Sequence, residues 1–180
     1  YKGNTRITVG KLFNAEENYI IASQSEGGQA VIYNYHGASI RNNFMALGKK
    51  YKAGLAVAIA KDADKNSRIV AGTDGGKRPE AIIFDKNFSK IIKRFFIDDK
   101  KLKSGLSLAA GDFNGDGVLE IADAFPSGKD KVVKVFSLTG KKLSQFKIPA
   151  VGFNAGAVSV AAADVNFDGK DDIVLMSGGQ

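Results

Sequence analysis

The feature that most constrains the fold of this chain is a nine-residue loop that occurs twice, 52 residues apart. The first copy, residues 112–120, reads DFNGDGVLE, and the second, residues 164–172, reads DVNFDGKDD. Both follow the pattern D-x-N-x-D-G-x-x-[DE], and apolar runs flank each copy. A loop that recurs at a fixed period predicts a repeat protein, in which each unit is one supersecondary structure.

Apolar and aromatic positions outside the loops keep the same period. An isoleucine opens the strand predicted after each loop, at spacings of 49, 52 and 52 residues, and aromatic residues mark a third and a fourth strand at spacings of 51 or 52. Agreement between independent positions makes a repeat of about 50 residues the consistent interpretation. The marker residues are Ile20, Ile69, Ile121, Ile173, Tyr33, Phe84, Phe136, Phe44, Phe95 and Phe146.

Each repeat has the pattern of four short strands. The first is rich in small apolar residues (55–59), the second is continuously apolar (69–71), the third is β-branched and aromatic (132–136), and the fourth alternates charged and apolar residues (142–148). No segment sustains a helical period, so the predicted class is all-β. Four-stranded units of this length are typical of β-propeller blades.

The repeat divides the chain into three complete blades and half of a fourth. We predict a single β-propeller fragment over residues 1–180, because four blades is the usual minimum for a closed ring. The remaining blades would come from the parent chain or from another polypeptide. The predicted blades span residues 5–53, 54–104 and 105–155, and the partial blade spans residues 156–180.

The two intact loops are predicted to bind one Ca²⁺ ion each. A hard cation takes several oxygen ligands, and alternate side chains of a tight turn supply them, together with one backbone carbonyl. Asp/Asn-rich turns stabilised by their own hydrogen bonds are the alternative. An EF-hand is excluded because a strand pattern follows both loops. The predicted ligands are Asp112, Asn114, Asp116, Val118 (carbonyl), Glu120, Asp164, Asn166, Asp168, Lys170 (carbonyl) and Asp172.

The corresponding loops of the first two repeats have lost this pattern. The second keeps Asp62, Asp64 and Asn66, but Arg68 stands where the ninth-position acid should be. We expect this loop to be empty, with the guanidinium replacing the missing cation. In the first repeat, residues 12–16 read LFNAE, and no ion is expected there.

Composition bounds the remaining possibilities. The chain has no Cys, which excludes disulfides and thiolate metal sites, and neither a leader-like segment nor a membrane span is present in the sequence. Its net charge is +7, and much of the excess lies in the Lys-rich segment 86–103. That segment is interpreted either as a solubilising outer strand or as a patch for an acidic glycan; nucleic acid is disfavoured because no aromatic residues are interleaved.

These loops resemble the FG-GAP/VCBS family, the calcium-loop blades of integrin α-subunit propellers and of many bacterial surface proteins. The segments 111–121 and 163–174 carry the resemblance, and the V-x-V-F third strand at residues 133–136 adds to it. The resemblance implies a seven-bladed ring, Ca²⁺ between the first two strands of a blade, and a role in adhesion or ligand binding.

The sequence offers little for enzyme chemistry. It has one histidine, His36, in a predicted turn, and no nucleophile elbow or phosphate-loop spacing. We therefore predict a non-enzymatic, calcium-stabilised extracellular or cell-surface propeller that serves as a binding or adhesion module for an unidentified protein or glycan. The alternatives are an accessory or spacer domain of a larger secreted enzyme or surface-layer protein, and a propeller enzyme whose active site uses other blades.

Overall fold

The computed structural model describes residues 5–14, 16–24, 27–73, 78–98, 105–127, 130–148 and 158–177, and in these residues the chain forms 14 strands and no helix. The all-β prediction is confirmed. The predicted blade boundary at 155/156 lies outside the described residues. The described part contains no helix long and apolar enough to cross a membrane.

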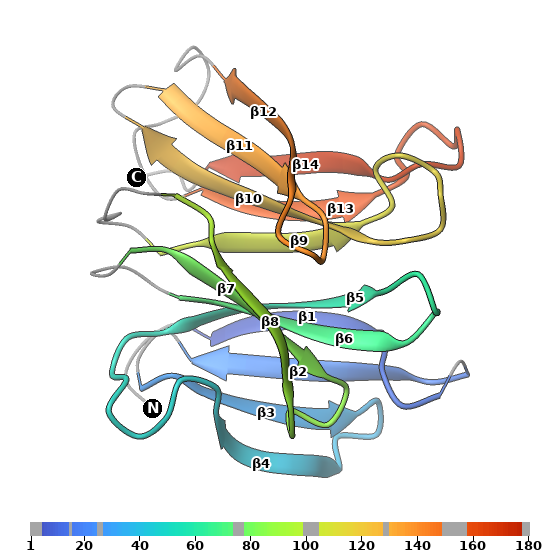
Figure 1. The fold of residues 1–180 in the computed structure, drawn as a ribbon. Coiled ribbons are helices and arrows are strands. Elements are labelled where there is room, and N and C mark those ends of the chain that lie inside the picture. The colour runs from blue at the N-terminus through green and yellow to red at the C-terminus, as the bar shows by residue number, and fades with distance from the viewer. Residues whose placement is uncertain are drawn as a thin grey trace.

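Each of the first three repeats forms one antiparallel four-stranded sheet in which the strands follow chain order, and the last repeat forms a two-stranded sheet (Figure 1). No sheet closes on itself in the described part of the chain. The first sheet contains β1 (Thr5–Lys11), β2 (Asn18–Gln24), β3 (Gln29–Asn34) and β4 (Ser39–Met45). The second contains β5 (Leu55–Lys61), β6 (Ser67–Thr73), β7 (Glu80–Asp85) and β8 (Ile91–Phe96). The third contains β9 (Ser107–Gly111), β10 (Glu120–Ser127), β11 (Asp130–Phe136) and β12 (Lys142–Ile148), and the last contains β13 (Val158–Ala163) and β14 (Asp172–Ser177).

Successive sheets meet through their first strands. β1 contacts β5, β5 contacts β9, and β9 contacts β13. In Figure 1 the strands β1, β5 and β9 run through the middle of the molecule, while β4 and β12 lie at its opposite extremes. The small residues of these first strands allow the close approach, as at Ala58 and Ala60, which are buried.

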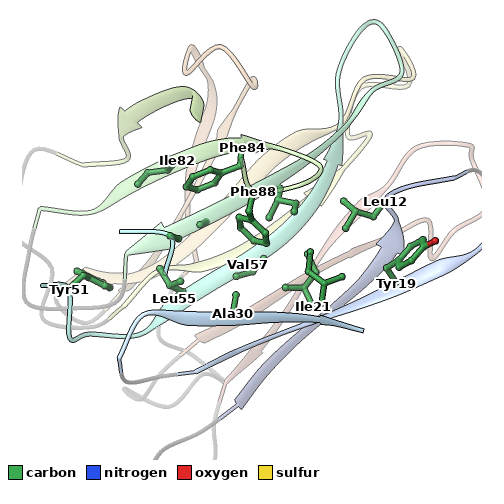
Figure 2. Close-up of a cluster of buried hydrophobic side chains, with 14 residues drawn as sticks. Leu12, Tyr19, Ile21, Ala30, Tyr51, Leu55, Val57, Ile82, Phe84 and Phe88 are labelled. Carbon is green, nitrogen blue, oxygen red and sulfur yellow. The ribbon is translucent and has the colours of Figure 1, made fainter. Parts of the chain in front are cut away.

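The core consists of apolar layers between neighbouring sheets. Ile21 and Ile32 of the first sheet pack against Leu55, Val57 and Phe84 of the second, all of them buried (Figure 2). A second layer joins the second and third sheets, and a smaller one joins the third sheet to β13 and β14. Each layer buries apolar surface, at about 25 cal/mol per Å² removed from water, so each sheet is stabilised mainly by its neighbours.

A recurrent hydrogen bond links neighbouring sheets at one end. In each case, a residue at or just before the start of a second strand donates to a backbone carbonyl at or just after the end of the preceding sheet's first strand. The three bonds are Ser67 Oγ to Lys11 O (2.9 Å), Leu119 N to Lys61 O (3.0 Å) and Asp171 N to Asp112 O (2.9 Å). The bonds hold the loops at this end in a fixed relation to one another.

Gly111 lies at a close approach of the third and fourth sheets. A Cβ at this position would lie 2.7 Å from the Ala162 Cβ and 3.0 Å from the Asp171 Cβ. Gly111→Ala is therefore expected to destabilise the protein by about 1–3 kcal/mol, the usual range for overpacking. Urea unfolding measures this loss, and Gly111→Ala combined with Ala162→Gly should recover part of it. An unchanged free energy of unfolding in the single variant would contradict the close approach.

Candidate metal centre

The four loops that join first and second strands lie at the same end of their sheets, on the right in Figure 1. In the third sheet this loop runs from the end of β9 to Glu120, the first residue of β10. It thus contains every ligand predicted for the first calcium site. The second predicted site lies between β13 and β14.

The side chains of the 112–120 loop organise its own backbone. The Asp112 carboxylate accepts hydrogen bonds from the N–H groups of residues 115, 116 and 117 at 2.7, 3.0 and 2.8 Å. Asn114 Oδ1 accepts from Asp116 N (2.8 Å), and Asp116 Oδ1 accepts from Val118 N (2.7 Å). The turn also needs positive φ angles at residues 115 and 117 (84° and 78°), which glycine adopts at little cost.

Glu120 closes the loop from its buried end. It is only 4% exposed, and its carboxylate accepts from Phe113 N (3.1 Å) and from Asn114 Nδ2 (3.0 Å). Burial raises the pKa of the Glu120 carboxyl, and the negative charges of Asp116 and Asp112 raise it further. The three carboxylates are thus close enough to repel one another.

The 164–172 loop repeats this arrangement. The Asp164 carboxylate accepts from the N–H groups of Asp168 (3.1 Å) and Gly169 (2.9 Å). Asn166 Oδ1 accepts from Asp168 N (2.9 Å), and Asp168 Oδ1 accepts from Lys170 N (2.9 Å). The ninth-position acid, Asp172, accepts from the N–H of residue 165 at 3.2 Å, as Glu120 does from Phe113 in the other loop. The two loops therefore share these backbone hydrogen bonds, but they differ at the amide, because Asn166 Nδ2 donates to Asp168 Oδ2 (3.2 Å) whereas Asn114 Nδ2 donates to Glu120.

The donor chemistry of both loops fits a hard divalent cation. Each loop offers carboxylate and amide oxygens at alternate positions, together with a backbone carbonyl at residue 118 or 170. Within the described residues, no three His, Cys, Asp or Glu side chains are grouped closely enough to hold an ion in this conformation. The carboxylates instead accept hydrogen bonds from backbone N–H groups of their own loop. Binding of an ion would therefore require carboxylate oxygens of each loop to move towards a common centre.

The loop of the second sheet has a different arrangement. Arg68 Nη2 lies 2.5 Å from Asp62 Oδ2, which is the ion pair expected from the sequence. Asp62 Oδ1 accepts from the N–H groups of Asp64 (3.1 Å) and Asn66 (2.9 Å). A fixed guanidinium thus lies where the third sheet has the Glu120 carboxylate.

The loop of the first sheet is organised by a single amide. Asn14 Oδ1 accepts from the N–H groups of Glu16 (3.0 Å) and Glu17 (2.7 Å), and Asn14 Nδ2 donates to the Tyr19 hydroxyl (3.2 Å). The oxygen-rich pattern of the two intact loops is not repeated here.

Two acidic residues were missed by the sequence analysis. Asp171 Oδ2 accepts from Asp112 N (2.8 Å), so one predicted calcium loop contacts the other. Asp123 is fully buried on β10, outside the loop. The paired acids at residues 171–172 and the interruption of the apolar run 121–125 by an acid were the available signals.

His36 lies in an exposed turn, and its ring lies against that of Tyr35, with 3.8 Å between ring centroids.

Comparison with known proteins finds sequence similarity over a short segment of the chain and structural similarity over nearly all of it. No protein-family model matches the chain. Integrin alpha pat-2 of Caenorhabditis elegans is 40% identical over 75 residues, and the Caenorhabditis briggsae protein of the same name is 36% identical over 75 residues. Each match covers 39% of this chain and 6% of the relative.

Three solved structures share the fold over 95% of this chain, which spans 39–40% of theirs. They are the exotype rhamnogalacturonan lyase YesX (TM-score 0.60, 14% identity), the Bacillus licheniformis rhamnogalacturonan lyase PL11 (0.60, 18%) and the rhamnogalacturonan lyase YesW (0.61, 14%). At these identities the likeness establishes the fold and not the activity.

The prediction that the chain is not an enzyme is contradicted by these neighbours, because the solved structures that share its fold are enzymes. The prediction relied on the missing nucleophile motifs, with no Cys and a single His in the sequence. Those absences argue against nucleophilic triads only. General acid–base chemistry uses Lys, Tyr, Asp and Glu as well, and the chain contains all four.

Proposed function

We propose that this chain is a calcium-stabilised extracellular β-propeller segment that serves as a binding or adhesion module. The observation that carries the proposal is the pair of oxygen-rich loops, 112–120 and 164–172, in which the side chains at the first, third, fifth and ninth positions accept hydrogen bonds from equivalent backbone N–H groups. The short similarity to integrin alpha pat-2 supports the adhesion role and the extracellular location. In this proposal the two loops hold Ca²⁺ through the ten residues identified from the sequence.

The packing of the sheets supports the propeller. The second, third and fourth sheets each pack the same face onto the preceding sheet. The corresponding face of the first sheet carries Ile7 and Val9, which are 66% and 57% exposed, beside Ala22 and Ile20 on the paired strand. We propose that a further blade, from the parent chain or from another polypeptide, covers this apolar face. The blades would follow the sequence boundaries, with the chain forming three blades and part of a fourth.

Titration calorimetry tests the metal sites directly. Adding Ca²⁺ to EDTA-treated protein is expected to give two sites per chain, and Asp116→Ala or Asp168→Ala should leave one, because each variant removes one central carboxylate. Asp64→Ala is the matched control in the second sheet's loop and should retain both sites. The absence of any binding heat, together with an unchanged melting temperature in Ca²⁺, would contradict the proposal.

The second candidate is an accessory or spacer propeller domain of a larger secreted enzyme or surface-layer protein. The observation that favours it is the likeness to lyases whose chains are more than twice as long as the part matched. The sequence of the complete parent protein discriminates the two. A catalytic domain beside this segment would favour the second candidate, and a wall or membrane anchor would favour the first.

A further inference from the structure

A groove lined by several cations, called the basic groove below, lies between the first and second sheets. It is at the end of the molecule that carries the calcium-type loops, residues 112–120 and 164–172 (Figure 1). We infer that this groove binds a carboxylated polysaccharide. The basic groove has a volume of about 430 Å³ and is formed by the end of β1 with the loop after it, the β5–β6 loop and the β7–β8 turn. Its size falls within the range of ligand pockets, roughly 300–1,000 Å³.

The lining carries far more positive than negative charge. Its five cations are Lys11, Lys61, Lys65, Arg68 and Lys86, and its single acid is Asp85. The Asp85 carboxylate is directed into its own turn, where Oδ1 accepts from the N–H groups of residues 89 and 90, both at 2.7 Å. A cleft lined by one sign of charge concentrates the field within it and attracts ions of the opposite sign.

Most of this positive charge is not neutralised by carboxylates. Lys11 Nζ donates to the Glu16 carbonyl (2.6 Å) and Lys65 Nζ to the Gly117 carbonyl (2.9 Å), and a carbonyl orients an ammonium without cancelling its charge. Within the described part of the chain, no carboxylate forms an ion pair with Lys61 or Lys86. Two ammonium groups are therefore held in place and two more are available to a ligand.

The groove occupies the place where the repeat has lost its calcium pattern. Arg68 replaces the ninth-position acid and is paired with Asp62, so it stiffens the loop from behind the groove. Lys65 has a positive φ of 60° and reaches the neighbouring loop of the third sheet. The loop that is proposed to bind Ca²⁺ in the later repeats thus forms a cationic wall of the groove here.

The remaining lining favours a sugar chain. Asn66, Ser67 and Asn87 contribute amide and hydroxyl groups, which match the hydroxyls of a saccharide. The described lining includes one aromatic ring, Phe13, which packs edge-on against Tyr19 at 4.9 Å between centroids. Proteins that bind single-stranded nucleic acids stack successive bases on several aromatic rings, which the described lining does not offer, so the groove suits a polyanion with separated carboxylates better than a single strand.

The Lys-rich segment that the sequence singled out is divided by the fold. Lys86 lines the basic groove, Lys90 and Lys93 are exposed before and on β8, and residues 100–103 lie outside the described part. The groove therefore combines one residue of that segment with cations that are 18 to 75 residues earlier in the chain. Only folding brings them together.

The inference rests on the proposed role as a binding module and supplies its ligand class. Three probes are immobilised in turn: neutral dextran, carboxymethyl-dextran and poly-L-glutamate. Wild type in calcium-containing buffer at low salt is expected to bind carboxymethyl-dextran, to ignore dextran and to bind poly-L-glutamate more weakly. Lys61→Glu/Lys86→Glu should weaken binding at least about tenfold, a loss of about 1.4 kcal/mol.

The control is Lys141→Glu/Lys147→Glu, which makes the same change in net charge at exposed positions beside and on β12. This variant should weaken binding by less than about threefold, because the two charges lie on the third sheet and not among the residues that line the groove. Equal losses in the two variants, no binding to carboxymethyl-dextran, or tighter binding to poly-L-glutamate would each overturn the inference. If calcium still raises the melting temperature in those cases, the groove fails and the calcium-stabilised propeller stands.

Discussion

Removing calcium with EDTA is expected to lower the melting temperature of this protein by about 5–10 °C for each occupied site. A ligand present at about a hundred times its Kd stabilises the folded state by about 2.7 kcal/mol, and each kcal/mol corresponds to about 2–4 °C in a chain of this size. Differential scanning calorimetry in EDTA and in excess Ca²⁺ measures the shift. Identical melting curves in the two conditions would exclude a stabilising ion.

The physical reason lies in the crowding of acids within each loop. In the third sheet, Asp112 and Asp116 lie near enough to Glu120 for their negative charges to contribute to its raised pKa. Backbone N–H groups offset only part of the repulsion among these carboxylates. A divalent cation at the centre of the loop would replace the repulsion with a net attraction between the carboxylates and the ion. The effect should reach beyond one loop, because Asp171 ties the 164–172 loop to the backbone of Asp112.

The calcium-induced shift, and not the absolute melting temperature, is the quantity to compare among variants. Asp116 and Asp168 also accept backbone hydrogen bonds, so their removal destabilises the calcium-free protein as well. Asp116→Ala and Asp168→Ala should each remove about half of the shift, and the double variant should remove nearly all of it. A full shift in the double variant would mean that the ion binds elsewhere.

The strand order could be predicted from the sequence because it depends on local and periodic signals. Four strands per repeat follow from where apolar runs stop at Gly- and Asp-containing turns. The positions at which strands end were harder to predict from the sequence. In the second repeat the second strand was predicted over residues 69–71, yet β6 runs from Ser67 to Thr73, because pairing with β5 and β7 extends the ladder at both ends.

The basic groove and the bond between the calcium-type loops could not be predicted, because each depends on residues far apart in the chain. Lys11 and Lys86 meet only when the first and second sheets pack together. In the sequence, Asp171 is one more acid beside Asp172. Its role as the acceptor of a hydrogen bond from Asp112 N becomes visible only when the two loops lie side by side. The prediction that the chain is not an enzyme failed for another reason: it rested on missing nucleophile motifs, and their absence says nothing about general acid–base chemistry.

Asp123 is the least expected residue of the core. It is completely buried between the second and third sheets, at the position where the second sheet has Ala71. Asp123 Oδ1 accepts from Ser107 N (3.2 Å), and its Oδ2 has no hydrogen-bond partner within the described residues. Lys134 lies opposite on β11, but its ammonium is directed to Asp98 Oδ2 (2.5 Å) and to the Ile97 carbonyl (3.2 Å).

These surroundings favour the neutral form of the acid. Burial raises the pKa of Asp123 to about 8; the charge of Lys134 lowers it and that of Asp98 raises it. In the unfolded chain the carboxyl ionises near its ordinary value of about 3.9. Between these two values the folded state holds a proton that the unfolded state has released. The stability contributed by the neutral acid is therefore complete below about pH 4 and is lost as the pH rises through about 8.

We expect the free energy of unfolding to fall with pH across this window by up to about 1.4 kcal/mol per pH unit, the limit for one proton. Asp123→Asn should flatten the dependence, because the amide resembles the protonated acid in shape and remains neutral. Asp64→Asn, at an exposed position, should leave it unchanged. The measurement is urea unfolding at several pH values in saturating Ca²⁺, so that the loop carboxylates contribute equally to all three proteins. If the curves of wild type and Asp123→Asn run parallel from pH 5 to pH 8, Asp123 is ionised in the folded state, and Lys134 must then turn from Asp98 to neutralise it.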